Sequence, residues 1–148
     1  QVRDLDPTMV DVLIIPGGDP VIREDILCLI RGCAARGAVI GGICGGVDYL
    51  ARAGILEGRR FTSYYEPNKV YDFLPKSGTM TGTMCEADEK VVTAKPEAYL
   101  DFAVELCRQA GKKISQEDVD ALVRWFKAPV TATLSSAEAG TSDNTRGL

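Results

Sequence analysis

The chain has 148 residues, of which 45% are hydrophobic and 26% charged, and its formal net charge is −4. This length and composition are typical of a single domain with its own hydrophobic core, and no apolar run approaches membrane-spanning length. A negative net charge gives no electrostatic reason to expect nucleic acid or an anionic membrane as a partner.

Five cysteines occur, at positions 28, 33, 44, 85 and 107, and histidine is absent. The odd count and the lack of a CxxC pair argue against a closed set of disulfides, so a reducing cytoplasm is the expected location. Without histidine, this chain cannot form a Cys-His or Ser-His dyad. The sequence also contains no metal-ligand spacing, phosphate loop or dinucleotide fingerprint, so no metal or cofactor is expected.

The first predicted elements are a strand and a helix. The continuous apolar run Asp11-Val12-Leu13-Ile14-Ile15 predicts a strand buried on both faces of a parallel sheet. Pro16-Gly17-Gly18 ends this strand, and Asp19-Pro20 has the form of a helix start, with Asp19 as the N-cap. The helix ends at Gly37, and its apolar stripe consists of Ile22, Ile26, Leu29, Ile30 and Cys33.

The stretch from Ala38 to Ala51 combines a short strand, a glycine-rich turn and the start of a helix. Gly42, Cys44 and Gly46 fit the G-x-nucleophile-x-G elbow, with sulfur in place of the usual serine hydroxyl. Glycines beside the tip avoid clashes with the elements behind it, and a helix N-terminus stabilises a thiolate. We interpret Cys44 as a nucleophile; the alternative is a small buried hydrophobe.

Shorter elements follow the elbow helix, which stops at Gly54. The sequence predicts a strand over residues 60–62, a polar aromatic loop over residues 63–67 and a brief helix from Asn68 to Leu74. Residues 80–85 and 90–94 are predicted to form a hairpin around the turn Glu86-Ala87-Asp88-Glu89.

Two helices are predicted in the last third of the chain. The first begins at Pro96 and ends at Gly111, with a core face of Leu100, Ala103, Val104, Leu106 and Cys107. The second begins at Ser115-Gln116-Glu117-Asp118, which resembles a capping box. Residues 1–130 are predicted to form one domain, and residues 131–148 a disordered tail.

Alternating strands and helices predict an α/β fold with a mainly parallel sheet. In such a sheet, loops that leave neighbouring strands at their carboxyl ends meet at the edge where ligands bind. We therefore expect the backbone N–H groups of Gly17, Gly18 and Gly45 to form an oxyanion hole beside Cys44. The alternative is that both glycine-rich turns are only tight connections.

The segments Ile14-Ile15-Pro16-Gly17-Gly18, Ile43-Cys44-Gly45-Gly46 and Thr62-Ser63, with the stretch from Ala51 to Arg60, resemble the ThiJ/PfpI (DJ-one/PfpI) family. This family belongs to the class I glutamine amidotransferase-like superfamily, and the resemblance covers roughly residues 10–108. It implies a flavodoxin-like three-layer α/β/α sandwich, often a homodimer, with a cysteine elbow. The activities it implies are peptidase or amidase action, glyoxalase or deglycase chemistry on α-oxoaldehydes, and oxidative-stress sensing.

Three departures from the family pattern affect the expected site. Gly45 stands where the peptidase-like branch has a histidine, and Tyr64 stands where the DJ-one branch has one. The β-α-β unit with which the family begins, and its glutamate beside the cysteine, have no counterpart here. We therefore expect the sequence to be N-terminally incomplete, because a doubly wound sheet without its first strand leaves a central edge unpaired.

The remaining candidates for proton transfer are carboxylates and Tyr64. Asp19, Tyr64 and Glu66 are possible cleft residues, and Tyr65 is named with Glu66. Helix capping is the favoured explanation for Asp19, and a surface loop explains Tyr65 and Glu66 equally well. Asp48, one turn into the elbow helix, is interpreted as part of a solvated helix face.

Two functions follow from the sequence. The first is a cysteine-dependent hydrolase or amidase, or a related glyoxalase-like or deglycase-like enzyme, acting on a small-molecule or peptide substrate. The alternative is a non-catalytic oxidative-stress or redox-sensing protein that uses the same cysteine. The enzyme hypothesis predicts that Cys44→Ala removes turnover and leaves the fold intact.

Overall fold

The computed structural model describes residues 2–19, 21–66 and 69–127. The chain divides into two compact units, residues 1–114 and 115–148. The predicted tail, residues 131–148, lies outside the described residues.

The first unit is built on a four-stranded sheet with the order β1-β2-β6-β5. Its strands are β1 (Val12–Ile15), β2 (Val39–Ile43), β5 (Cys85–Asp88) and β6 (Val91–Ala94). β1 pairs with β2 and β2 with β6 in parallel, whereas β5 and β6 are antiparallel. The predicted α/β fold with a mainly parallel sheet is confirmed.

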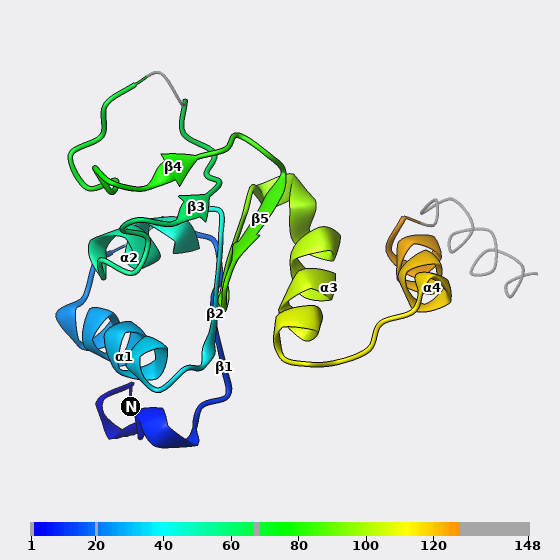
Figure 1. Ribbon diagram of the computed structural model, residues 1–148, viewed down its shortest axis with the longest axis horizontal. Helices are drawn as coiled ribbons and strands as arrows, with labels where there is room; N and C mark the ends of the chain where they lie inside the picture. The colour runs from blue at the N-terminus through cyan, green and yellow to red at the C-terminus, as the bar shows by residue number, and fades with distance from the viewer. Residues whose placement is uncertain (1, 20, 67–68, 128–148) are drawn as a thin grey trace, which may run out of the picture. The chain divides into compact units, whose positions relative to one another are not determined.

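Helices cover both faces of this sheet (Figure 1). α1 (Glu24–Ala35) and α2 (Gly46–Arg52) lie on one face, and α3 (Tyr99–Gln109) lies on the other. A separate hydrophobic core lies on each face of the sheet, and successive side chains of β2 point into different cores. Ile40 packs with α1 and α2, whereas Val39 packs with α3. This arrangement explains why the β2 sequence is continuously apolar.

β1 is an edge strand among the described residues, and only one of its faces is buried. Leu13 and Ile15 pack into the core beneath α1 and α2. On the other face, the side chains of Val12 and Ile14 are 37% and 50% exposed. The predicted burial of this strand on both faces is therefore wrong, because α3 packs on β2, β6 and β5.

The remaining elements of the first unit are short. Two 3₁₀ helices, Val2–Asp4 and Pro7–Met9, precede β1, and a third, Pro96–Ala98, precedes α3. β3 (Arg60–Phe61) and β4 (Thr79–Met80) form a separate parallel pair. In the described part of the chain, no helix is both long and apolar enough to cross a membrane.

Two predicted elements after the elbow helix differ in the structure. Residues 69–74 form no helix, and the predicted cap Asn68 lies outside the described residues. The hairpin exists, but Asp88 pairs with Val91, so its turn is Glu89-Lys90. Met80, where the predicted first arm begins, belongs to Thr79–Met80 and pairs with β3 instead.

Two helix predictions also need correction. α1 begins at Glu24 with Arg23 as its N-cap residue, so Asp19 does not cap it, and Pro20 lies outside the described residues. In α3 the buried residues are Phe102, Val104 and Leu106, whereas Ala103 is exposed. Phe102 and Leu106 are one turn apart and pack over Gly41 of β2, whereas Gly42 faces Leu50 of α2.

The described part of the second unit is α4 (Gln116–Phe126). Its predicted capping box is present. The Ser115 hydroxyl accepts the Asp118 N–H at 3.1 Å, and the Asp118 carboxylate accepts the Ser115 N–H at 2.9 Å.

Candidate active site

Cys44 occupies the turn between β2 and α2 in a left-handed conformation, with φ of 55°. This conformation costs a residue other than glycine on the order of 1–2 kcal/mol. Hydrogen bonds hold the turn on both sides, since Cys44 N–H donates to the Ala94 carbonyl at 3.0 Å and Val47 N–H to the Cys44 carbonyl at 3.1 Å. The local geometry is that of a strand-turn-helix elbow with the thiol at its tip.

The loop after β1 packs directly against this turn. A Cβ atom on Gly45 would lie 2.2 Å from the Gly18 carbonyl oxygen, and one on Gly46 would lie 2.1 Å from the Ile15 carbonyl oxygen. β1 and β2 are parallel neighbours, so the loops at their carboxyl ends meet here. Both glycines are therefore required by the close approach of backbone to backbone.

Gly17 lies beside the thiol. A Cβ atom placed on Gly17 would be 2.9 Å from the Cys44 Cβ and 3.3 Å from its Sγ. Among the backbone hydrogen bonds between described residues, none is donated by the N–H of Gly17, Gly18 or Gly45. The structure thus brings Cys44, which is partly exposed, together with the three glycines that the sequence predicts as an oxyanion hole.

A cavity of about 280 Å³ opens at the same loops. Gly17, Gly18, Asp19 and Gly45 line it, and Ile26 and Tyr49 are among its other lining residues. Asp19 is exposed there and is the carboxylate that faces this cavity. Glu66, the other carboxylate predicted as a cleft residue, does not line it; its exposed side chain pairs with Lys69 at 2.8 Å.

Asp48 is buried, with only 4% of its surface exposed, so its interpretation as a solvated helix residue is wrong. One carboxylate oxygen accepts a hydrogen bond from the Tyr65 hydroxyl at 2.8 Å. The other, Oδ1, has no hydrogen-bond partner among the described residues. Burial raises the pKa of Asp48, and this outweighs the opposite effects of the Tyr65 hydrogen bond and the Arg52 charge.

An aromatic cluster from the loop after β3 covers Asp48. The ring centroids of Tyr64 and Tyr65 are 4.2 Å apart, and those of Tyr65 and Tyr71 are 4.4 Å apart. The Tyr64 hydroxyl, on a side chain that is 44% exposed, donates to the Tyr65 hydroxyl at 2.7 Å. Burial and the bonds to its two neighbours raise the pKa of Tyr65.

The family model that describes the DJ-1/PfpI family matches residues 1–109. The chain belongs to the DJ-1/PfpI family. Its fold is accordingly the flavodoxin-like fold that the family resemblance implies. No curated protein matches the chain.

Solved structures of DJ-1/PfpI proteins resemble this chain. A DJ-1 superfamily protein from Agrobacterium tumefaciens is 27% identical with a TM-score of 0.70, over 86% of this chain and 69% of that one. A ThiJ/PfpI family protein from Bacillus anthracis is 28% identical with a TM-score of 0.60, over 79% and 57%. An AraC family transcriptional regulator from Pseudomonas putida, 22% identical with a TM-score of 0.66 over 80% and 68%, shares the fold. The chain thus spans about two thirds, or less, of the length of these proteins.

In this DJ-1/PfpI chain, sequence reasoning named both Asp48 and Tyr65 but missed that they are bonded to each other and that Asp48 is buried. Asp48 follows Cys44 by four positions, a spacing that places it one helical turn away, and this signal is visible in the sequence. Tyr65 is 17 positions further along, and nothing in the local sequence indicates that its hydroxyl reaches Asp48.

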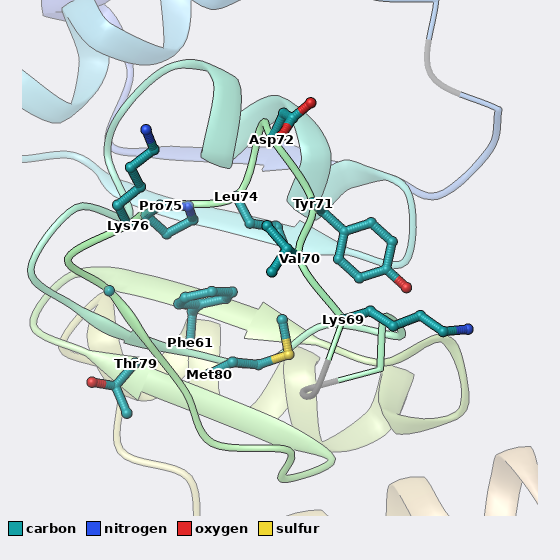
Figure 2. A pocket seen from close by; sticks show the side chains of 11 residues that line it. Phe61, Lys69, Val70, Tyr71, Asp72, Leu74, Pro75, Lys76, Thr79 and Met80 are labelled. Atoms are coloured by element: carbon teal, nitrogen blue, oxygen red, sulfur yellow. The ribbon is translucent and has the colours of Figure 1, made fainter.

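A second cavity, of about 420 Å³, lies between the β3-β4 pair and residues 69–78. Figure 2 shows Phe61 and Met80 at its apolar side, with the Lys69 and Lys76 side chains extending in different directions. It shares no lining residue with the cavity at the glycine loops.

The other cysteines lie outside the candidate site. Cys33 is in the core, and burial raises its pKa. Burial, with the nearby Glu105, Asp101 and Glu86, raises the pKa of Cys85 to about 11. Cys28 is exposed on α1, beside Glu24 and Arg31.

Proposed function

We propose that this chain carries the active site of a cysteine-dependent enzyme that acts on a small carbonyl compound. The candidate reactions are hydrolysis of an amide and glyoxalase-like or deglycase-like conversion of an α-oxoaldehyde. The observation that supports the proposal best is the left-handed Cys44 with its thiol against Gly17. Strained residues persist where the surrounding structure holds them, and they cluster at functional sites.

The first chemical step is attack of the Cys44 thiolate on the carbonyl carbon. The new carbon–sulfur bond forms as the carbonyl π electrons move to oxygen, and the N–H groups of Gly17, Gly18 and Gly45 are the candidate donors to that oxyanion. One such donor contributes about 3 kcal/mol to transition-state stabilisation in enzymes of this type. With an amide, the carbonyl then re-forms as the carbon–nitrogen bond breaks, and the amine leaves with the proton that the thiol gave up, which yields a thioester. With an aldehyde, the oxyanion takes up that proton and yields a hemithioacetal.

The cavity at the glycine loops favours a small substrate. Cys44 does not line it, but Gly17 and Gly45 beside Cys44 do, and its volume of about 280 Å³ is just below the usual range of about 300–1,000 Å³ for small-molecule sites. A compound of a few carbon atoms, or the terminal residue of a peptide, is the size that it accommodates.

The test compares the wild type with Cys44→Ala and with Cys28→Ala, in which an exposed thiol outside the site is removed. Loss of methylglyoxal and release of para-nitroaniline from an amino-acid anilide are measured, with circular dichroism to check the fold. We expect turnover of one probe in the wild type and in Cys28→Ala, and none in Cys44→Ala. Turnover that survives in Cys44→Ala would exclude the nucleophile.

A redox-sensing role is the second candidate, supported by the partial exposure of Cys44 beside Gly17, whose N–H donates no backbone hydrogen bond among the described residues. Titration with hydrogen peroxide, followed by peptide mass spectrometry, tests it. Addition of one or two oxygen atoms to Cys44 ahead of the exposed Cys28, without turnover of either probe, would favour sensing over catalysis.

A further inference from the structure

The second cavity, between the β3-β4 pair and residues 69–78, has no part in the function proposed for Cys44. Its volume of about 420 Å³ lies within the usual range of about 300–1,000 Å³ for small-molecule sites. Neither Cys44 nor Gly17, Gly18 or Gly45 lines it. We call it the β4 cavity, and a molecule that occupies it is a second ligand rather than a substrate held at the thiol.

The interior of the β4 cavity is apolar. Phe61 of β3 and Met80 of β4 are paired across the two parallel strands, so their side chains lie on the same face of the pair. Figure 2 shows Val70 and Leu74 on the opposite side of the cavity, facing these two residues. Val70 is 94% exposed. An apolar group bound here would remove its surface, and that of its neighbours, from water, which favours binding.

Contacts outside the β4 cavity hold both of its walls. On one side, Ser77 lies between two lining residues in the sequence, and its hydroxyl accepts the Gly58 N–H at 3.0 Å. On the other side, the ring centroid of the lining residue Tyr71 is 4.4 Å from that of Tyr65, whose hydroxyl donates to Asp48 of α2 at 2.8 Å. Walls that the fold already holds need little ordering when a ligand binds, and this favours affinity.

Two opposite charges lie at the rim of the β4 cavity. Asp72 and Lys76 both line it, and both side chains are exposed. Neither forms an ion pair or a side-chain hydrogen bond with another described residue. The third charged lining residue, Lys69, is instead paired with Glu66 at 2.8 Å. One carboxylate and one ammonium group, at the two ends of the segment 72–76, are therefore available to a ligand.

We propose that the β4 cavity binds a free α-amino acid with a large apolar side chain. The side chain occupies the interior against Phe61 and Met80, while the carboxylate pairs with Lys76 and the ammonium group with Asp72. A ligand with a charge of one sign would pair with only one of the two rim residues, so a zwitterion has the complementary charge. The inference concerns a second ligand and does not depend on the reaction proposed at Cys44.

The test uses L-leucine and two analogues that each lack one charged group. 4-Methylpentanoate has no ammonium group, and 3-methylbutylamine has no carboxylate. Each compound is titrated at neutral pH into the full chain labelled with nitrogen-15, and binding is followed by the NMR chemical shifts of the backbone amides. We expect leucine to shift the amides of residues 69–80 in a saturable manner. Each analogue should bind about two- to fivefold more weakly, which is the effect of one ion pair at a solvent-exposed position.

Substitutions at exposed positions locate the site. Val70→Trp places an indole in the cavity and should abolish the shifts caused by leucine, whereas Val21→Trp, at another valine that is 77% exposed, should leave them unchanged. Asp72→Asn should make leucine and 4-methylpentanoate bind equally, and Lys76→Gln should do the same for leucine and 3-methylbutylamine. Lys112→Gln, at an exposed lysine that does not line the cavity, is the charge control.

The proposal is overturned if leucine shifts no amide of residues 69–80, or if either analogue binds the wild type as tightly as leucine does. Leucine shifts that persist in Val70→Trp would also overturn it. The spectrum of each variant shows whether it is folded, and if Val70→Trp is not, the two charge variants decide the outcome by themselves. None of these measurements involves turnover, so the proposal for Cys44 is tested separately.

Discussion

The buried carboxyl of Asp48 imposes a free-energy cost on the folded chain at neutral pH. One of its oxygens is bound by Tyr65 and the other is without a partner among the described residues. Cys44, four positions earlier, carries a second cost in its left-handed backbone. Two energetically unfavourable features four residues apart are expected at a site whose residues are retained for their chemistry.

Asp48→Asn should make the stability of the protein less dependent on pH. The pKa of Asp48 is raised in the folded state, whereas an unfolded aspartate titrates at about 3.9. Above about pH 4 the folded wild type therefore binds more protons than the unfolded chain, and its free energy of unfolding falls as pH rises to the raised pKa. Urea unfolding across this interval should show the variant gaining stability relative to the wild type. A difference that stays constant would contradict this.

Cys85 should be nearly unreactive at neutral pH. With its pKa raised to about 11, its thiolate fraction at pH 8 is roughly two-hundredfold below that of an ordinary thiol of pKa ~8.5. A time course of iodoacetamide labelling, resolved by peptide, should therefore show the exposed Cys28 modified long before Cys85. Comparable rates at the two positions would show that Cys85 is more open than its surroundings indicate.

At the scale of elements, the site depends on how closely the loop after β1 approaches the start of α2. The contacts are backbone against backbone, at Gly18 with Gly45 and at Ile15 with Gly46. β2 and α3 also approach each other closely. A Cβ atom on Gly41 of β2 would lie 2.7 Å from Leu106 and 2.8 Å from Phe102 of α3. The glycines of this region therefore set the spacing between elements as well as the turn.

Gly46→Ala should destabilise the protein more than Gly54→Ala. The new methyl group would lie 2.1 Å from the Ile15 carbonyl oxygen, and backbone cannot rotate away as a side chain can. Gly54 has φ of 79° but nothing within 4 Å of its added Cβ, so its substitution costs only about 1 kcal/mol of strain. We expect Gly46→Ala to cost about 2–3 kcal/mol in urea unfolding. Equal losses in the two variants would argue against the contact.

At the scale of the whole molecule, the first unit contains both hydrophobic cores. Their buried residues run from Ile15 to Leu106, one cluster under α1 and α2 and the other under α3. The candidate site lies at the carboxyl ends of β1 and β2 within this unit. Nothing that buries these cores or forms the elbow comes from the described residues after 114.

A truncated chain of residues 1–114 should therefore fold and keep its Cys44 reactivity. We expect its thermal midpoint to lie within a few degrees of the full chain, since a change of about 1 kcal/mol shifts the midpoint by only a few degrees. Truncation after residue 98 provides the contrast, because it removes α3 and exposes Val39 and Val92. Circular dichroism should show that the shorter fragment is unfolded. A 1–114 fragment that also fails to fold would show that residues 115–148 contribute to the cores.

Much of the described chain could be predicted from short-range sequence signals. The run Val12–Ile15, the turn at Cys44 and the capping box at Ser115 are set by neighbours within a few residues. The predicted α1 start at Asp19-Pro20 failed even so, because the structured helix begins only at Glu24. A favourable cap sequence does not form a cap when the loop is used elsewhere, here to line the cavity at Gly17 and Gly18.

The sequence by itself determined the DJ-1/PfpI family, the mainly parallel α/β fold and the strand-turn-helix at Cys44, because each depends on local pattern. Only the tertiary structure decided that one face of β1 is exposed, that β3 pairs with β4, and that Asp48 is buried beneath Tyr65. These outcomes depend on which distant segment covers a given face. Burial is a property of the packed chain, and no residue carries it in its own sequence neighbourhood.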